Sequence, residues 1–444
     1  MSKILSVILI PVYTSQLTTE EYGVADLISV TVDLLYPLLT MTIYEAALRF
    51  LLKDKNDKKE ILTVGLVITA GACGLVCILA VFITDIIHIE KYYILFCLYF
   101  ASVALKSLFT YYSKGLEEIN TLMLGGVINT VTFLLSNILL IVVMKLGVKG
   151  YLVSFILANF VTCFFILFRL NIRKILFPFS GIKMPILKEM LRYSIPLMPN
   201  SMSWWISNSS DRYILNYYHG AAVGGLYATA YKIPTFVSMF SDIFISAWQI
   251  SAVEKFGSKE SISFYRTVYR MYSSVLCICS ATIIITSKII SFLLFQKDFF
   301  IAWKFVPFLA VAVVFSGIGT FVGSIFTSSM KTGFLFFSTV TAAVLNIILN
   351  ICLIPQFNGY GAAFATIISY VVNWIMRIQM SKRIINMRLI CMKEIFSYIL
   401  IIVLAFICIG EYFSPATVVY VLIVFLNRGV LVDAFQMFRK KMRV

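Results

Sequence analysis

Charged side chains inside otherwise apolar segments are the residues of this chain with the clearest capacity for chemistry. They are Asp33, Glu45, Lys106, Asp211, Arg212, Lys232, Asp242, Lys288, Arg377 and Arg428. A charge at the centre of a bilayer costs at least ~2.5–3.5 kcal/mol on insertion scales, so each of them needs a partner or water. Lysine and arginine in such places suit the binding of an anionic ligand, and arginine can grip it with two parallel hydrogen bonds.

Two of the aspartates lie within polar stripes that have helical spacing. The first stripe is Ser29, Asp33, Tyr36, Thr40 and Tyr44, and the second, with the same spacing, is Tyr231, Thr235, Ser238, Asp242 and Ser246. Residues three or four apart share one face of a helix. We expect these faces to line a water-filled cleft. Hydrogen bonding between packed helices is the alternative reading.

The remaining charges allow two readings each. Asp211 and Arg212 are adjacent and point about 100° apart on a helix, so each needs a partner elsewhere. We expect Arg212, Lys232 and Lys106 to supply cations inside the cleft, with structural pairing as the alternative. Glu45 and Arg49 are four residues apart and form either a simple pair or a gate at the cytoplasmic mouth.

The sequence shows no catalytic pattern. The chain has 2 histidines, His88 and His219, and no Gly-x-Ser-x-Gly or phosphate-binding loop motif. Metal binding through Cys277 and Cys279 is not expected, because no histidine cluster accompanies them. We therefore expect neither an enzyme nor a bound cofactor, and a gradient of H⁺ or Na⁺ is the candidate energy source.

The composition requires a lipid environment. The chain has 444 residues, of which 60% are hydrophobic and 13% charged, and its mean hydropathy is +0.93. The net charge of +16 is spread between apolar runs, which argues against a nucleic-acid partner. The runs of spanning length cover 24–48, 61–84, 92–112, 121–144, 151–168, 191–216, 226–250, 271–294, 305–329, 334–354, 361–380, 395–411 and 416–437.

A shorter run at 4–16 brings the expected number of spanning helices to about fourteen. We expect this run to lack its first turns because the start of the chain is missing; a stubby helix or a cleaved signal peptide is the alternative. Most Lys and Arg lie in alternate loops, which predicts both termini and the longer loops on the cytoplasmic side.

The chain also contains an internal repeat. Residues 23–25 (GVA) open the second run as 225–227 (GLY) open the eighth, and 147–150 (GVKG) correspond to 358–361 (NGYG). Two halves that both begin and end inside must be related by an axis along the membrane normal. We predict an all-α polytopic membrane protein with an N-terminal lobe at 1–170, a cytoplasmic linker at 171–190, a C-terminal lobe at 191–381 and two added helices at 394–437.

Several short segments along the chain form a set that can be compared with known families. They are 191–199 (LRYSIPLMP), 208–215 (NSSDRYIL), 224–232 (GGLYATAYK), 11–14 (PVYT), 20–23 (EEYG), 47–50 (ALRF), the Asn346-x-x-x-Asn350 spacing, 354–355 (IP) and 361–363 (GAA). This set resembles the Wzx-type polysaccharide and O-antigen flippases of the multidrug/oligosaccharidyl-lipid/polysaccharide exporter superfamily. The resemblance covers nearly the whole chain, but its motifs are diffuse.

The resemblance implies a MATE-like fold, with two six-helix lobes around a central cavity and two further helices. It implies alternating access, and flipping of an undecaprenyl-diphosphate-linked oligosaccharide across the bacterial cytoplasmic membrane for assembly of O-antigen, capsule or exopolysaccharide. Membrane lipids, a polymerase and glycosyltransferases would be its partners. Carried over by position, the cationic cavity points to Arg49, Arg212 and Lys232.

Other functions remain open from the sequence. An ion-coupled drug/cation antiporter on the same fold would need a cavity dominated by acids, whereas cations here accompany Asp33, Asp211 and Asp242. A membrane-embedded glycan polymerase or transferase would need a large extracytoplasmic loop, and every expected outer loop is short. A scaffold without transport activity is the last alternative.

Overall fold

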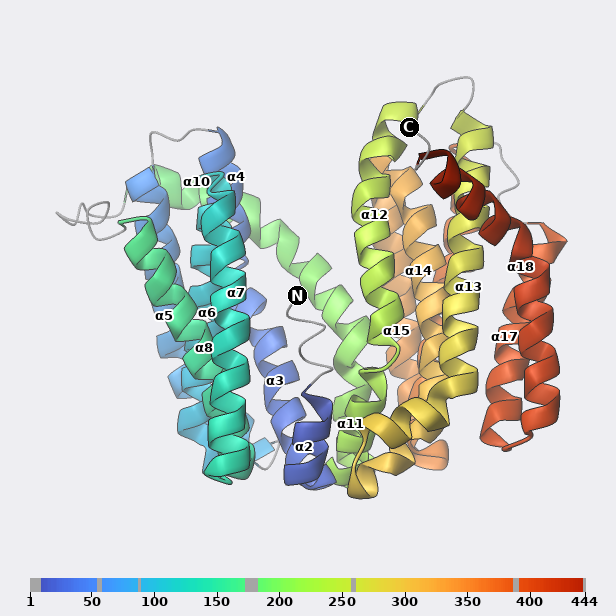
Figure 1. The fold of residues 1–444 in the computed structure, drawn as a ribbon. Helices are drawn as coiled ribbons and strands as arrows, with labels where there is room; N and C mark the ends of the chain where they lie inside the picture. Colours follow the sequence, from blue (N-terminus) through green and yellow to red (C-terminus); the bar gives the residue numbers. More distant parts are fainter. Residues whose placement is uncertain are drawn as a thin grey trace. The chain divides into compact units, whose positions relative to one another are not determined.

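The computed structural model describes residues 9–53, 58–86, 89–171, 183–256, 261–385 and 391–441. Within these ranges every regular element is a helix, and 11 helices are long and apolar enough to cross a membrane. The protein is therefore an all-α, multi-pass membrane protein (Figure 1). Its contacts divide it into two compact units, Met1–Trp205 and Ile206–Val444, with the division inside a helix.

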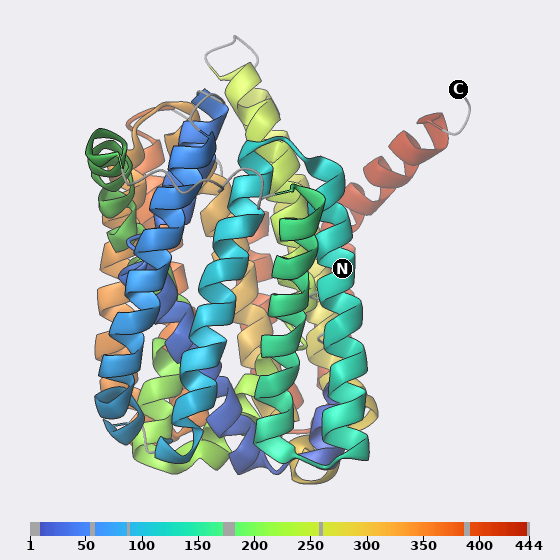
Figure 2. The same cartoon turned by 90° about the vertical axis from the view of Figure 1, so that its left-hand side faces the viewer.

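Unit 1 is a bundle whose long helices run side by side (Figure 2). Its helices are α2 (Ile10–Gln16), α3 (Thr19–Leu39), α4 (Ile43–Lys53), α5 (Lys58–Ile86), α6 (Tyr93–Gly115), α7 (Ile119–Asn137), α8 (Gly147–Arg169) and α10 (Met184–Ser194). A short 3₁₀-helix, Glu90–Tyr92, precedes α6, and α7 continues into a π-helix, Ile138–Val143. Helix α8 packs against both α6 and α7.

Unit 2 is built around one central helix, α14, which packs against α12, α13, α16 and α17. Its helices are α11 (Met198–Tyr231, which begins in unit 1), α12 (Thr235–Lys255), α13 (Ser261–Leu294), α14 (Val306–Ser328), α15 (Thr332–Phe357), α16 (Gly359–Ser381), α17 (Met392–Ile409) and α18 (Phe413–Lys441). The 3₁₀-helices Ile195–Leu197 and Lys297–Lys304 (η4) precede α11 and α14.

The helices form where long apolar runs lack breaking residues, and local signals set some of their ends. Helix α3 begins at a capping box: Thr18 Oγ1 accepts from the Glu21 amide at 3.1 Å, and the Glu21 carboxylate accepts from the Thr18 amide at 2.9 Å. Such a cap contributes about 1 kcal/mol. It fixes the start of the helix that carries Asp33.

The two units repeat the same local architecture. Helices α6 and α14 have the same length, as do α8 and α16. In unit 2, α16 packs against α14 and α15, just as α8 packs against α6 and α7 in unit 1. Helices α6 and α7 start at Tyr93 and Ile119, and α14 and α15 start at Val306 and Thr332, so one constant offset relates both pairs. The predicted repeat is seen in these three-helix sets, whereas the parallel relation between the two halves stays a prediction.

The second predicted run, 24–48, is not one continuous helix. Pro37 has no amide proton for the bond to the carbonyl of Asp33, and α3 ends at Leu39. Met41 and Thr42 have positive φ angles before α4 begins. The stripe expected on one face is therefore interrupted between Tyr36 and Tyr44, although their rings remain 5.6 Å apart.

The eighth predicted run, 226–250, is broken as well, at the turn Lys232–Pro234 between α11 and α12. The two breaks do not fall at equivalent places in the repeat, so identical polar spacing does not produce identical local structure. The start of the first predicted run at 4–8 and most of the predicted linker at 171–190 lie outside the described residues. The expected domain boundaries stay predictions.

Labelling from the two sides of the membrane tests the predicted topology. In a variant without native cysteines, Lys297→Cys should react with an impermeant maleimide added outside intact cells, and Lys382→Cys should react only after lysis. Both side chains are exposed at opposite ends of unit 2 helices. External labelling at Lys382→Cys would contradict the assignment. The loop positions Lys55 and Arg173, expected on the same side, lie outside the described residues.

Candidate functional site

A buried carboxylate lies at the centre of a polar cluster in unit 2. The side chain of Asp211 is 3% exposed. It accepts a hydrogen bond from Tyr227 Oη at 3.0 Å on one oxygen and from the Arg212 amide at 2.9 Å on the other. Both tyrosine and aspartate belong to α11, so the contact depends on how that helix is bent.

The bend is made by Gly220, whose φ of 79° and ψ of 168° lie in a region that only glycine adopts readily. In a straight helix Asp211 and Tyr227 would be about 24 Å apart along the axis. The glycine turn makes two antiparallel limbs out of α11. These limbs belong to the seventh and eighth predicted runs, and the turn brings Tyr227 on one limb to Asp211 on the other.

Two asparagines from α15 and a tyrosine from α16 complete the cluster. Ser210 Oγ donates to Asn346 Oδ1 at 3.2 Å, and Asn350 Nδ2 donates to the same oxygen at 2.9 Å. Tyr370 Oη donates to Asn208 Oδ1 at 3.1 Å. Within the described part of the chain, no group donates to the buried Asn350 Oδ1. The cluster is therefore rich in buried oxygen acceptors.

The predicted cation Arg212 lies at the edge of this cluster. Its side chain is half-buried, and the guanidinium carbon is 5.6 Å from the centre of the Tyr231 ring. A cation held over an aromatic face is stabilised by about 0.5–2 kcal/mol. Lys232, the next residue after Tyr231, is half-buried in the turn between α11 and α12. The structure thus brings Asp211 and Arg212 together with the residue that precedes Lys232.

In unit 1, the predicted cation Lys106 lies among amides. Its Nζ donates to Asn159 Oδ1 at 3.0 Å and to Asn129 Oδ1 at 3.4 Å, and Asn159 Nδ2 donates to Ser102 Oγ at 3.1 Å. These bonds link α6, α7 and α8. The Asp33 carboxylate also interacts electrostatically with Lys106. Since Lys106 is still partly exposed, its role in ligand binding stays a prediction.

The other predicted site residues lie nearer the surfaces of their units. Asp33 on α3, Asp242 on α12 and Arg49 on α4 are exposed, and Glu45 is half-buried. Glu45 interacts electrostatically with Lys114. These side chains belong to two separate compact units, and the cleft that they are expected to line stays a prediction.

Sequence reasoning noted Arg377 but did not place it in a site. Its side chain is 7% exposed. Nε donates to Ser338 Oγ at 3.1 Å, Nη1 to the Gly319 carbonyl at 2.8 Å and Nη2 to Thr339 Oγ1 at 3.0 Å. The arginine therefore links α16 to α14 and α15.

The glycines of α14 explain how this guanidinium fits. A Cβ atom at Gly323 would lie 3.0 Å from Arg377 Nη1. Gly319 holds the position in α14 that Lys106 holds in α6, counted from the first residue of each helix. In each unit a cation thus links the three equivalent helices. In unit 1 it is Lys106 on α6, and in unit 2 it is Arg377 on α16. The sequence offered one indication of this site: at the repeat position where unit 1 has Lys106, unit 2 has Gly319.

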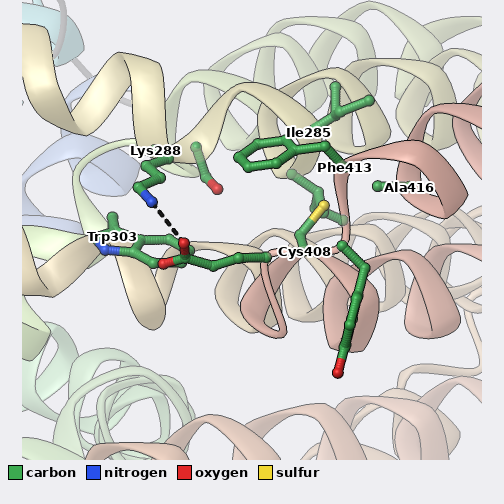
Figure 3. A pocket seen from close by; sticks show the side chains of 10 residues that line it. Ile285, Lys288, Trp303, Cys408, Phe413 and Ala416 are labelled. Carbon is green, nitrogen blue, oxygen red and sulfur yellow. Dashed lines mark ion pairs between the residues drawn. The ribbon is translucent and has the colours of Figure 1, made fainter.

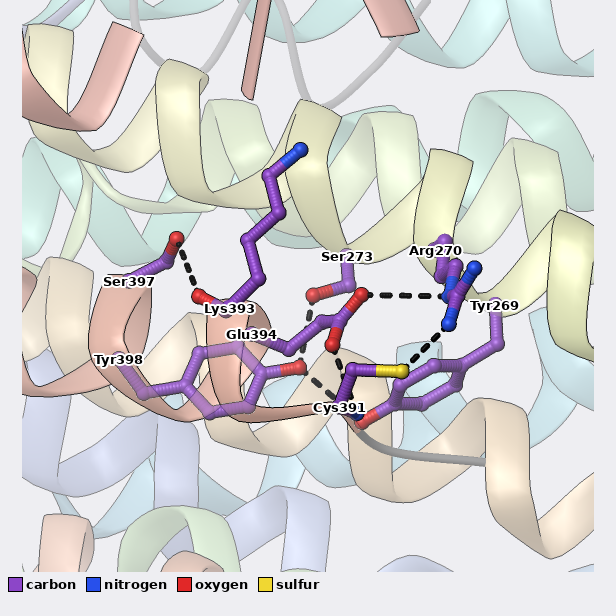
Figure 4. Close-up of polar contacts among 8 residues, drawn as sticks. All are labelled: Tyr269, Arg270, Ser273, Cys391, Lys393, Glu394, Ser397 and Tyr398. Carbon is purple, nitrogen blue, oxygen red and sulfur yellow. Dashed lines mark hydrogen bonds and ion pairs between the residues drawn. The ribbon is translucent and has the colours of Figure 1, made fainter. Parts of the chain in front are cut away.

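A second set of polar side chains bonds α17 to α13 within unit 2 (Figure 4). Arg270 on α13 pairs with the buried Glu394 at 3.4 Å and also contacts the Cys391 thiol. Next to them, the Tyr398 hydroxyl lies 2.7 Å from Ser273 Oγ and 3.0 Å from Tyr269 Oη. Helix α17 is therefore bonded to α13 near its first residue.

Replacing Arg377 tests its role as a helix link. Arg377→Met should lower the free energy of unfolding by about 2 kcal/mol, because three hydrogen bonds between membrane helices are lost at about 0.6 kcal/mol each. Thermal unfolding of the purified protein in detergent would measure this. Arg377→Lys should fall in between, and Arg49→Met, at an exposed position, is the control. Equal melting temperatures for all variants would contradict the link.

Comparison with known proteins places the chain in a family. A family model described as "polysaccharide biosynthesis protein" matches residues 1–249. A protein of Haloferax volcanii, described as a probable low-salt glycan biosynthesis flippase, Agl15, is 25% identical over 193 residues. That match covers 43% of this chain and 41% of the relative, so it spans less than half of either protein.

Solved structures show the same fold. An inward-facing multidrug-resistance MATE family transporter superposes with a TM-score of 0.74 at 15% identity, covering 87% of this chain and 95% of its own. The lipid II flippase MurJ in an inward closed conformation gives 0.72 at 13% identity, covering 100% and 98%. The MATE-like fold expected from the sequence is confirmed. Since the family model matches more than half of its residues, this multi-pass membrane protein belongs to the polysaccharide biosynthesis protein family.

Proposed function

We propose that the protein flips an undecaprenyl-diphosphate-linked oligosaccharide across the bacterial cytoplasmic membrane. The observation that carries this proposal is the half-buried guanidinium of Arg212, held over Tyr231 beside the polar cluster of unit 2. Family membership supports it. So do the description of the Haloferax volcanii relative as a probable flippase and the fold shared with a lipid II flippase.

The substrate sets the physical requirement. A diphosphate carries about two negative charges at neutral pH, and moving it unaided through a ~30 Å hydrocarbon layer is prohibitively costly. A flippase must therefore offer cations along a hydrated path, while the lipid tail stays in the bilayer. Arg212 meets this need with a planar fork of donors, and Lys232 adds a point charge close by in the chain.

Glycan assembly gives the transporter its neighbours. A lipid-linked oligosaccharide has to be built by glycosyltransferases on the cytoplasmic side and consumed on the other side by a polymerase or a transferase. We expect O-antigen, capsule or exopolysaccharide as the product. The competing function is a drug/cation antiporter, which is favoured by the likeness in fold to a multidrug transporter. Transport assays separate the two functions. Movement of a lipid-linked glycan supports the flippase, whereas exchange of small organic cations without a glycan supports the antiporter.

Arg212 gives the sharpest test of the proposed substrate. Arg212→Ala should abolish export of the glycan, and Arg212→Lys should retain part of it. Lys232→Ala should reduce export less than Arg212→Ala, because lysine offers a single point charge and not the planar donor fork of arginine. Surface polysaccharide and accumulated lipid-linked intermediate are measured at matched protein levels.

The matched control is Arg428→Ala. Arg428 is an exposed arginine of α18 that also lies over an aromatic ring, 4.0 Å from the centre of Phe425. Its loss should leave export unchanged. Normal surface polysaccharide in the Arg212→Ala strain would refute the role of Arg212, whereas an export defect in both variants would indicate a general effect of removing a membrane arginine.

The polar cluster of unit 2 is our candidate for the coupling-ion site. Asp211 is a buried carboxylate, and its neighbour in the chain, Ser210, is bonded to the Asn346 side chain. Carboxylate and amide oxygens are suitable ligands for H⁺ or Na⁺ exchange. Binding of the cation would neutralise Asp211 inside the membrane. The energy source for transport would then be an ion gradient.

Removing the carboxylate tests this role. Asp211→Asn is nearly isosteric and should keep the fold but remove the dependence of flipping on an imposed H⁺ or Na⁺ gradient in proteoliposomes. Tyr227→Phe, which removes the hydrogen bond to Asp211, should shift the ion concentration at half-maximal rate without abolishing the dependence. Collapsing each gradient separately identifies the ion. An unchanged gradient dependence in Asp211→Asn would exclude this site.

A further inference from the structure

A shallow hollow lies at one end of unit 2, away from the polar cluster (Figure 3). The turn between α17 and α18 meets α13 and η4 there, and the hollow is open to the surroundings and encloses little space of its own. Its walls are mostly apolar, and Ser287, Lys288 and Glu411 are polar residues of its lining. No step of the proposed transport uses these residues.

The two charged side chains form an ion pair. Lys288 Nζ lies 2.9 Å from Glu411 Oε2, and their side chains are 36% and 51% exposed. Lys288 Nζ also lies 5.3 Å from the centre of the Trp303 ring. Because both charges keep accessible surface, a ligand can reach the pair. The pair is neutral overall, so it attracts neither a pure anion nor a pure cation.

The hollow lies beside the last turns of α13, which carry exposed apolar side chains. That helix continues for six residues beyond Lys288 to Leu294, or about 9 Å, whereas α17 has only 18 residues and ends at Ile409. Ile289, Phe292 and Leu293 on the last turns of α13 are 63%, 71% and 65% exposed, as expected for side chains that contact lipid. We call this hollow the notch; the exposed apolar turns of α13 lie beside it, and the ion pair is part of its lining.

We propose that this notch binds the headgroup of a zwitterionic phospholipid that carries a primary ammonium. The lipid phosphate accepts hydrogen bonds from Lys288, and its ammonium donates to Glu411. The exposed rings of Tyr412 and Phe413 contact the glycerol and the start of the acyl chains. The two headgroup charges lie in one molecule, which matches a site with one charge of each sign.

The same chemistry excludes the other common headgroups. An anionic phospholipid leaves Glu411 facing a negative charge, and a quaternary ammonium has no N–H to donate to the carboxylate. A charged pair near the hydrocarbon boundary is also stabilised when polar headgroup atoms take the place of water around it. The proposal depends on the protein spanning a membrane and not on what it transports.

Lipid retention tests the proposal on the full-length chain. The protein is purified in detergent, exposed to equimolar phosphatidylethanolamine, phosphatidylcholine and phosphatidylglycerol, and examined by native mass spectrometry. Phosphatidylethanolamine should be retained about fivefold to tenfold over phosphatidylcholine. Glu411→Gln should remove this preference, and Lys288→Met should lower retention of both lipids.

The control is Glu60→Gln, which breaks the Lys183–Glu60 ion pair of 2.8 Å in unit 1 and should leave retention unchanged. Thermal stability is measured in each lipid in parallel. Equal retention of all three lipids by the unmodified protein would overturn the proposal. So would a uniform loss of stability in Glu411→Gln and Lys288→Met, independent of lipid, because it would reduce the pair to a tie between helices.

Discussion

The hydrocarbon core of the membrane is the constraint on which the rest of this structure depends. It supplies no hydrogen-bond partner, so backbone groups must be satisfied within helices and polar side chains must find partners from other helices. Lys106 and Arg377 show the result, because each donates to neutral acceptors on two neighbouring helices. Arg212, which is half-buried, lies instead over the aromatic ring of Tyr231.

The two units share helix lengths and packing but differ in their polar contacts. Helix α6 of unit 1 carries Lys106, and the equivalent helix α14 of unit 2 has Gly319 at that position. In unit 2 the link between the helices is made by Arg377 on α16. Duplication therefore preserved the contact between three helices rather than any particular residue. The buried carboxylate cluster around Asp211 occurs in unit 2, where the glycine turn at Gly220 brings two limbs together.

The sequence predicted the features that follow from hydropathy and periodicity. Spanning runs, the repeat and a polar setting for Asp211 and Arg212 follow from such patterns. The partner of Asp211 could not be predicted, because Tyr227 reaches it only after the chain reverses at Gly220. One of the three acceptors of Arg377 is the backbone carbonyl of Gly319, which has no sequence signature. The break after Pro37 was readable in principle, but the regular spacing of polar residues concealed it.

The attachment of the last two helices has a mechanical consequence. Arg270 and Lys288 are separated by about five full turns of α13, so both project from the same face of that helix. One bonds to the beginning of α17 and the other to the turn after its end. A helix held at one point can still pivot or roll about that point. The bonds of Arg270 and Tyr398 hold the first turns of α17, whereas the exposed Lys288–Glu411 pair restrains its far end only weakly, so α17 is firmly attached at its beginning and more loosely at its end.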